Sequence, residues 1–172
     1  LATSSAASDV YKRQLFFLTN FEAPNYRLVK ILFTGEVVEI IPETDLALKS
    51  VSILDDFIIT NSINTDMNSM VEFYSKNGEL LDYKIPDDIE GTLSSFSMYK
   101  DKLRFSASNF INPTRYIDLD LNTLDYTIVW QDKVSNFNPA DYEKTFTYYE
   151  SKDGTMVPLT LSLIHISEPT RH

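Results

Sequence analysis

Short apolar runs, each bounded by turn-forming residues, dominate the middle of the chain. Between residues 50 and 85 they predict two tight hairpins, one turning at Asp55-Asp56 and one at Lys76–Glu79, where Gly78 supplies the positive φ that such turns need. Pro86 ends the last run because proline cannot donate to a β-ladder. The unit is a predicted four-stranded antiparallel meander, with strands at Ser50–Leu54, Phe57–Ser62, Ser69–Ser75 and Leu80–Ile85.

The same unit returns downstream with the same spacing. Pro42 and Pro86 lie 44 residues apart, and so do Pro86 and Trp130. A four-stranded repeat of about 40–50 residues is typical of β-propeller blades, and a β-sandwich with evenly spaced strands is the alternative. The strands of this unit are predicted at Ser94–Tyr99, Leu103–Ser108, Arg115–Asp120 and Asp125–Trp130.

A partial unit precedes these two, with strands predicted at Leu15–Asn20, Arg27–Phe33 and Val37–Ile41 and its first strand missing. Thr19-Asn20 recurs as Thr60-Asn61, which we interpret as a shared second-strand motif. We therefore predict an all-β fold, with about three four-stranded antiparallel blades of an incomplete β-propeller over residues 15–135. Closed propellers have about four to eight blades, so the open arc predicts neighbours that cover its flanks.

The pattern changes after the last blade. Asn136, Asn138 and Pro139 indicate a loop, and alternating residues then predict a hairpin of Thr145–Glu150 and Thr155–Thr160. We interpret residues 136–160 as a linker and the first hairpin of another domain.

Both ends of the chain differ from its middle. Residues 1–14 are mostly small and polar without strand alternation, and residues 161–172 follow no earlier pattern. The two strings are similar to translated sequencing-adaptor read-through, a contaminant of assembled metagenomic reads. We expect both ends to be artefacts that are excluded from fold reasoning, and ordinary flexible termini are the alternative.

Three stretches resemble prolyl oligopeptidases, which belong to the S9 class of serine peptidases. Leu18–Asn20 with Ala23–Ile31 is similar to a propeller strand pair of that family, and Val38–Glu43 is similar to the strand that closes the same blade. Tyr149–Pro158 resembles the segment where the family's chain leaves the propeller and begins its α/β-hydrolase domain. The resemblance covers essentially all of residues 15–160.

The resemblance implies a parent protein in which a seven-bladed propeller filters peptides by size above a buried Ser-Asp-His site that cleaves after proline. We therefore expect a non-catalytic propeller fragment that gates access of short proline-containing peptides to a catalytic domain absent from this chain. Its partners would be that hydrolase domain, which residues 136–160 begin, and the remaining blades. The alternatives are a propeller interaction scaffold, or a fragment of an oligopeptidase B-like or dipeptidyl-peptidase-like enzyme.

Composition and net charge argue against several classes of binding partner. The 172 residues carry a net charge of −10, which argues against nucleic acid and against a basic membrane-surface patch. No apolar run approaches the roughly 18 residues of a membrane span. Cysteine is absent, which excludes disulfides and thiolate sites and suits a reducing compartment. We expect a cytoplasmic protein, with the periplasm as the alternative.

No catalytic, cofactor-binding or metal-binding residue is predicted, and no cofactor is expected. A nucleophile elbow needs Gly-x-Ser-x-Gly, and no two of the four glycines flank a serine. A Ser-His-Asp triad also needs a base, usually histidine. The two histidines, His165 and His172, both fall in the suspected artefact.

Several acidic residues have both a functional and a structural interpretation. Asp87–Glu90 is either an acidic metal or substrate loop or a solvated loop between blades, and it lacks the ligand alternation of an EF-hand. Asp55-Asp56 is either an acid pair or a hairpin turn. Asp118 and Asp120 alternate with apolar residues, which predicts one wetter strand face.

Aromatic residues are open to the same two interpretations. Trp130 is either a stacking platform or packing between blades. Tyr26-Arg27 is either an anion site or a blade-to-blade or surface contact. A cluster near the C-terminal hairpin either lines a cleft between domains or packs in a core; its members are Tyr142, Phe146, Tyr148 and Tyr149.

Overall fold

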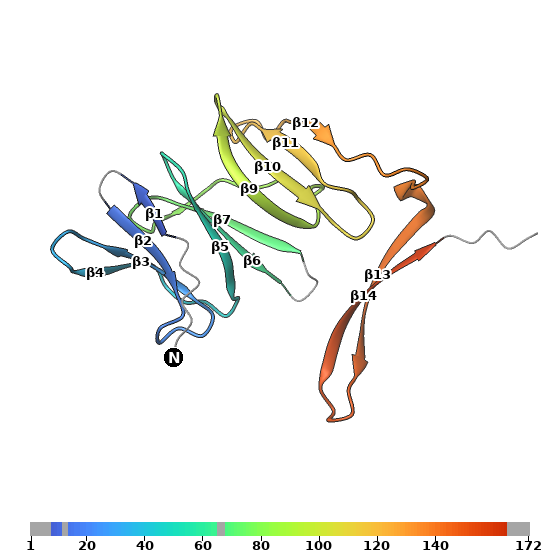
Figure 1. Ribbon diagram of the computed structural model, residues 1–172, viewed down its shortest axis with the longest axis horizontal. Coiled ribbons are helices and arrows are strands. Elements are labelled where there is room, and N and C mark those ends of the chain that lie inside the picture. Colours follow the sequence, from blue (N-terminus) through green and yellow to red (C-terminus); the bar gives the residue numbers. More distant parts are fainter. Residues whose placement is uncertain (1–7, 12–13, 65–67, 165–172) are drawn as a thin grey trace, which may run out of the picture.

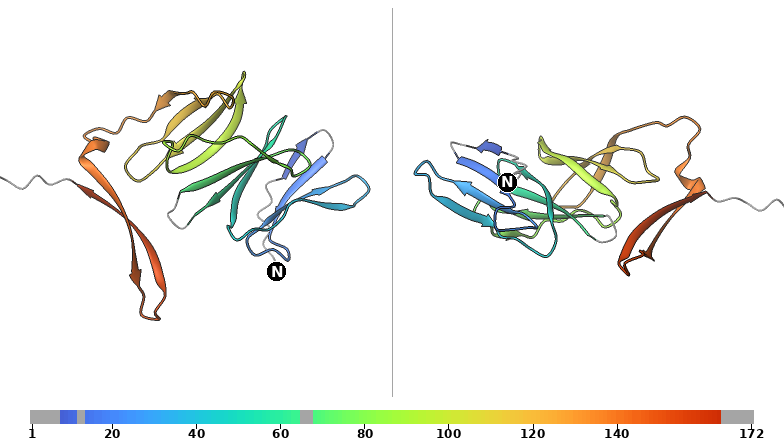
Figure 2. Two further views of the ribbon diagram at one scale, coloured as in Figure 1. Left: turned by 180° about the vertical axis from the view of Figure 1, so that it is seen from behind. Right: turned by 60° about the horizontal axis from the view of Figure 1, so that its bottom comes forward.

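The computed structural model describes residues 8–11, 14–64 and 68–164. They form three four-stranded antiparallel sheets and one two-stranded hairpin. The three sheets lie side by side in chain order like the blades of an open fan (Figures 1 and 2). The predicted all-β arc of three propeller blades is confirmed, and the sheets do not close into a ring.

The first blade contains a strand that the pattern of the sequence misses. Its order is β1-β2-β3-β4, with bounds Ser8–Tyr11, Gln14–Thr19, Arg27–Ile31 and Val37–Ile41. The prediction that the first strand is absent is therefore wrong, because Ser8–Tyr11 pairs antiparallel with Gln14–Phe17. The small polar residues around it hide the alternation on which strand prediction depends.

The second blade ends earlier than its apolar run suggests. Its strands are β5 (Leu48–Ile53), β6 (Ile58–Ile63), β7 (Ser69–Tyr74) and β8 (Leu80–Leu81). The predicted fourth strand was longer, but the chain leaves the ladder after Leu81 and places the Tyr83 ring 5.8 Å from the rings of both Phe57 and Phe73. Aromatic packing therefore replaces ladder hydrogen bonds at this edge.

The third blade and the C-terminal hairpin follow the predicted order closely. The blade comprises β9 (Thr92–Tyr99), β10 (Lys102–Ser108), β11 (Arg115–Leu119) and β12 (Tyr126–Gln131). A 3-10 turn at Pro139–Asp141 then leads into β13 and β14.

The C-terminal hairpin is longer than predicted. Strand β13 (Tyr142–Glu150) pairs along its full length with β14 (Met156–Ile164). The hairpin therefore runs four residues beyond position 160, and it stands apart from the three blades in every view (Figures 1 and 2).

The strand register shows that the predicted Thr-Asn motif of the second strands does not occupy equivalent positions in the two blades. Leu18 pairs with Leu28 in the first blade, and Asn61 pairs with Val71 in the second. Each pair lies at the same distance from the turn that follows, where Leu32 and Ser75 close equivalent turns. Asn61 is therefore equivalent to Leu18 and not to Asn20, so the recurring Thr-Asn dipeptide is a coincidence of composition.

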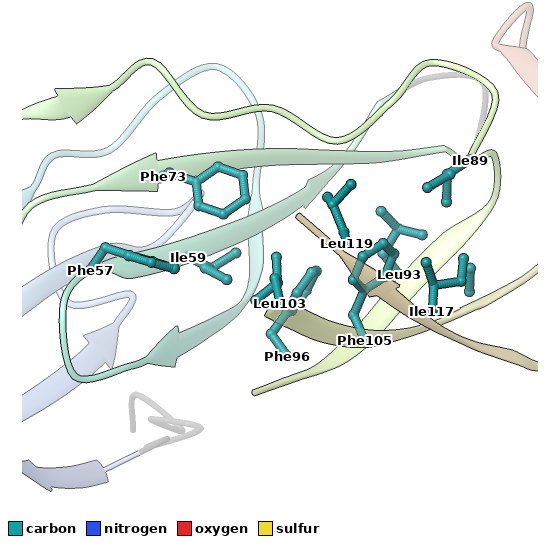
Figure 3. Close-up of a cluster of buried hydrophobic side chains, with 11 residues drawn as sticks. Phe57, Ile59, Phe73, Ile89, Leu93, Phe96, Leu103, Phe105, Ile117 and Leu119 are labelled. Carbon is teal, nitrogen blue, oxygen red and sulfur yellow. The ribbon is translucent and has the colours of Figure 1, made fainter. Parts of the chain in front are cut away.

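Apolar side chains fill the two seams between the blades. The seam between the first and second blades contains Phe16, Leu28, Ile40, Ile41 and Ile58. The larger seam between the second and third blades is drawn in Figure 3, with Ile59 and Phe73 facing Leu103 and Phe105. Because successive strand residues point to opposite faces, adjacent Ile58 and Ile59 enter different seams. Among the described residues, no helix has both the length and the apolar character needed to cross a membrane.

Candidate functional site: blade seams and open blade faces

Hydrogen bonds as well as apolar contacts join the second and third blades. The Asn61 side-chain amide donates to the Leu93 carbonyl at 2.7 Å, and the Leu93 N–H donates to the Ser69 hydroxyl at 2.9 Å. The Ser69 N–H in turn donates to the Gly91 carbonyl at 3.1 Å. Both main-chain groups of Leu93 are thus satisfied by the neighbouring blade, which holds the two sheets in one relative position.

The acidic loop Asp87–Glu90 connects these two blades. Its Ile89 is buried in the seam, and a carboxylate oxygen of Asp88 accepts from the Tyr126 hydroxyl at 2.6 Å. That hydrogen bond raises the pKa of Tyr126 above its ordinary value. The interpretation as a loop between blades is therefore the one the contacts support.

A cavity of about 360 Å³ adjoins the same loop. Asn68, Lys84, Asp87 and Glu90 contribute its polar lining. Among the described residues, no group of three or more His, Asp or Glu side chains is arranged to hold a metal ion. The cavity therefore offers mixed polar groups of both charges without a defined ligand set.

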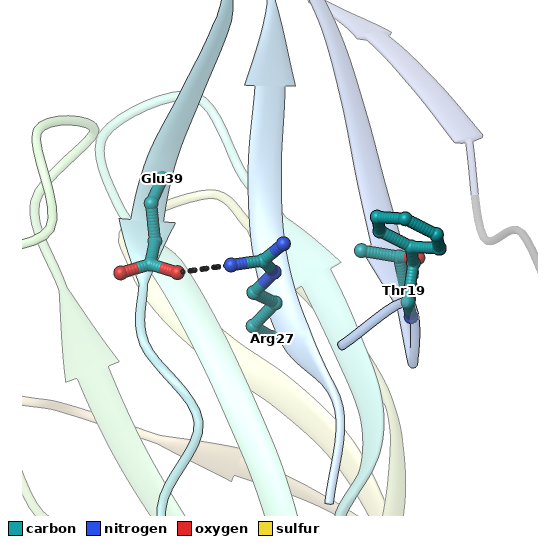
Figure 4. Close-up of polar contacts among 4 residues, drawn as sticks. Thr19, Arg27 and Glu39 are labelled. Atoms are coloured by element: carbon teal, nitrogen blue, oxygen red, sulfur yellow. Dashed lines mark hydrogen bonds and ion pairs between the residues drawn. The ribbon is translucent and has the colours of Figure 1, made fainter. Parts of the chain in front are cut away.

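The outward face of the first blade, which we call the first open face, is largely apolar. Phe17, Val29, Ile31 and Val37 line a hollow of about 290 Å³ on it. Arg27 lies at its edge and forms an ion pair with Glu39 at 3.0 Å between Nη1 and Oε2 (Figure 4). The prediction that Arg27 makes a surface contact is confirmed.

The outward face of the third blade, which we call the last open face, has a different chemistry. Arg104 donates twice to the Asp118 carboxylate, at 2.6 and 2.7 Å, and its guanidinium lies 3.9 Å from the centre of the Tyr99 ring. These hydrogen bonds raise the pKa of Arg104 and lower that of Asp118. Ser94 and Ser106 share a further hydrogen bond at 2.8 Å.

Trp130 also lies on the last open face. Its ring packs edge-to-face against Tyr116 at 5.6 Å, and half of the residue is exposed. Among the described residues Trp130 contacts its own blade, and the interpretation as packing between two blades stays a prediction.

The remaining acidic predictions are partly corrected. Asp118 lies on the outward face of the blade, opposite to the seam-facing Ile117 and Leu119, but its carboxylate is paired with Arg104 and the residue is only 7% exposed. Asp120 lies beyond the strand, where its Oδ1 accepts from the N–H groups of Asn122 and Thr123, and these bonds lower its pKa. Asp55-Asp56 forms the turn between β5 and β6, as predicted.

The aromatic cluster of the C-terminal hairpin does not form a buried core among the described residues, and its place in a cleft between domains stays a prediction. Tyr148 is 45% exposed and Tyr149 is 51% exposed. Phe146 packs edge-to-face on Tyr148 at 5.1 Å. The hairpin thus presents aromatic surface without a covering layer among the described residues.

A Ser-His-Asp triad would need His165 or His172 as its base, and both histidines lie outside the residues that the structure describes. The prediction that the chain supplies no catalytic or cofactor-binding residue stays a prediction. Sequence reasoning missed Asn61 and the Arg104–Asp118 pair. The pair was detectable in principle, because the β10–β11 register places the two residues directly opposite each other.

The architecture defines the class of protein as a β-propeller, and a segment of each of several solved structures matches this arc of blades. A structure from a study of two prolyl endopeptidases and their inter-domain dynamics matches with a TM-score of 0.76 and 23% identity, covering 93% of this chain and 24% of that one. Apo prolyl oligopeptidase B from Galerina marginata matches with a TM-score of 0.73 and 24% identity, covering 93% and 24%.

Sequence relatives identify the family. The pattern described as "Prolyl oligopeptidase, N-terminal beta-propeller domain" matches residues 3–132, and the chain belongs to this family. Prolyl endopeptidase from Dictyostelium discoideum is 30% identical over 163 residues, covering 87% of this chain. Prolyl oligopeptidase A from Galerina marginata is 30% identical over 155 residues, covering 86%. The chain spans about a fifth of each relative, 21% in both cases.

Proposed function

We propose that this chain supplies part of the propeller of a serine endopeptidase that cleaves short proline-containing peptides. In that protein the propeller limits which peptides reach a catalytic domain that this chain does not contain. The observation that carries the proposal is the change from the blade repeat to an unrelated hairpin after Gln131, in a chain whose relatives are named prolyl endopeptidases.

Two features of the arc support neighbouring parts of a larger protein. The first open face leaves Val37 60% exposed and Phe21 60% exposed beside the hollow, and apolar surface of this kind is stabilised when another layer covers it. The β13–β14 hairpin is a two-stranded sheet, which is marginally stable by itself in water. The remaining blades and a hydrolase domain are the partners that would cover these surfaces.

The function is tested with a chimera. Residues 15–131 replace the equivalent segment of the Dictyostelium discoideum prolyl endopeptidase, and kcat/KM is measured for a short proline-linked reporter and for the same site inside a long polypeptide. We expect the chimera to keep the preference of the unmodified enzyme for the short reporter. A second chimera, in which a flexible linker of equal length replaces the segment, should lose that preference.

The proposal fails if the first chimera melts at the same temperature as the unmodified enzyme and yet cleaves long and short substrates equally well. Purified residues 1–172 should not hydrolyse the reporter. Activity of that chain by itself would contradict the assignment of the chemistry to a separate domain.

A further inference from the structure

Two turns of the chain have nearly the same sequence and the same main-chain hydrogen bonds. Residues 75–79 read Ser-Lys-Asn-Gly-Glu between β7 and β8, and residues 151–155 read Ser-Lys-Asp-Gly-Thr between β13 and β14. In each turn the N–H of the first residue donates to the carbonyl of the fifth at 2.8 Å. The glycine N–H donates to the carbonyl of the first residue, at 3.0 and 2.9 Å respectively. The third position therefore compares Asn77 with Asp153 in one turn geometry.

Asn77 has the surroundings in which an asparagine side chain loses its amide group. The residue is exposed, and no other asparagine of the chain precedes a glycine. In this reaction the main-chain nitrogen of the following residue attacks the side-chain carbonyl carbon, and glycine leaves that nitrogen unhindered because it has no Cβ. Since the Gly78 N–H is bonded to the Ser75 carbonyl in the closed turn, the attack takes place when the turn opens locally.

We propose that Asn77 is a site of spontaneous deamidation, and that its two products act differently on the seam between the first and second blades. The Gly78 nitrogen bonds to Asn77 Cγ, and the side-chain nitrogen leaves as ammonia with the proton of the Gly78 N–H. Water then opens the resulting succinimide ring. Opening at Cγ gives aspartate, whereas opening at the main-chain carbonyl of residue 77 gives isoaspartate, in which the main chain runs through Cβ and Cγ. The reaction is independent of peptidase activity.

The turn of the C-terminal hairpin shows that aspartate fits this geometry. Asp153 Oδ1 accepts from the Thr155 N–H at 3.0 Å, and this hydrogen bond lowers the pKa of Asp153. The equivalent Glu79 N–H donates to the Ser75 hydroxyl at 3.2 Å. An aspartate at position 77 would have the same donor within reach, so this product keeps the turn.

Isoaspartate lengthens the main chain by one carbon directly before Gly78, where the second blade meets the first. A Cβ at Gly78 would already collide with the Ile40 carbonyl oxygen, whereas a Cβ at Gly154 would meet only a side chain of its own hairpin, at 3.9 Å. In the same turn as Gly78, Lys76 Nζ lies 5.9 Å from the centre of the Phe16 ring. Phe16 and Ile40 both belong to the first seam, so a displaced turn disturbs the packing of these two blades.

The site is tested by ageing the wild-type chain, residues 1–172, at mildly alkaline pH. Mass spectrometry of tryptic peptides compares the incubated chain with a sample that was not incubated, and labelling by isoaspartyl methyltransferase detects isoaspartate. We expect Asn77, in the peptide of residues 77–84, to deamidate faster than Asn122, which is also exposed in a turn but precedes Thr123. Equal rates at the two asparagines would overturn the assignment of the site.

Melting temperatures separate the two products. Fresh Asn77→Asp should melt like the fresh wild-type chain, whereas the incubated wild-type chain should contain a component that melts a few degrees lower. Isoaspartyl methyltransferase with its methyl donor returns isoaspartate to aspartate through the succinimide, and this treatment should remove that component. Incubated Asn77→Ala is the matched control and should keep its melting temperature. Isoaspartate at position 77 without a low-melting component would overturn the proposal, and so would a fresh Asn77→Asp chain that melts as low as that component.

Discussion

The side-chain amide of Asn61 donates to the main-chain carbonyl of Leu93 across the seam between the second and third blades, at 2.7 Å. Both residues are buried, at 5% and 3% exposure. In the first blade the equivalent position is held by Leu18, which is also buried. A polar side chain therefore stands in an apolar position and gives this seam a directional contact that apolar packing by itself does not provide.

Asn61→Ala is expected to lower the free energy of unfolding by about 1–3 kcal/mol, because the buried Leu93 carbonyl loses its partner. Urea unfolding measures this free energy, and the fluorescence of Trp130, the single tryptophan, reports the unfolding of the third blade. Asn77→Ala, in an exposed turn, is the control and should change stability by less than about 0.5 kcal/mol. Equal midpoints for the two variants would contradict a structural role of the hydrogen bond.

Two glycines in equivalent turns offer a matched comparison. Gly35 and Gly78 have φ values of +85° and +88°. A Cβ at Gly78 would lie 2.0 Å from the Ile40 carbonyl oxygen of the first blade, whereas a Cβ at Gly35 meets nothing within 4 Å. Gly35→Ala should therefore cost only the strain of the left-handed conformation, about 1–2 kcal/mol.

Gly78→Ala should cost more than Gly35→Ala, because the first and second blades must also move apart. Differential scanning calorimetry of the two variants measures the difference in melting temperature. Identical melting temperatures would show that the close approach at Ile40 does not hold these blades together.

Phe73→Ala is expected to destabilise the chain by about 3–5 kcal/mol, because it opens a cavity in the larger seam. Phe73 is 0% exposed and its ring contacts the Phe57 ring edge-to-face at 5.6 Å. Phe33→Ala is the control, since Phe33 is 79% exposed in a turn and should change stability by less than about 0.5 kcal/mol. Chemical denaturation of both variants checks the contrast, and a small effect at Phe73 would argue against the packing of this seam.

The Arg104–Asp118 pair predicts a dependence of stability on pH. The hydrogen bonds from Arg104 hold the pKa of Asp118 below its ordinary value, so the folded state favours the charged carboxylate. The stabilisation is complete above the unfolded pKa of about 3.9 and is lost as the pH falls through the lower folded pKa.

Asp118→Asn should therefore lower the unfolding free energy near neutral pH, and its difference from the wild-type chain should shrink in acid below about pH 4. Urea unfolding at several pH values measures that difference. Asp101→Asn, in the exposed turn before β10, serves as the control. A difference between wild type and Asp118→Asn that stays constant with pH would contradict the role assigned to the ion pair.

Strands with strong local patterns were predicted correctly, and those without them were not. Val37–Ile41 has the predicted bounds, because an apolar run lies between a glycine turn and a proline. Ser8–Tyr11 was missed because its residues do not alternate. The fourth strand of the second blade was overextended, because the ring contacts of Tyr83 form only after the sheet has folded.

The amino-acid sequence by itself determined the order of the hairpins, the blade repeat and the change of pattern after Gln131, because turns and alternation are local properties of the chain. Only the tertiary structure decided that Asn61 crosses a seam and that Arg104 meets Asp118 on an open face. Those contacts depend on strand register and on which face meets a neighbouring blade, and both are settled when the sheets pack against each other.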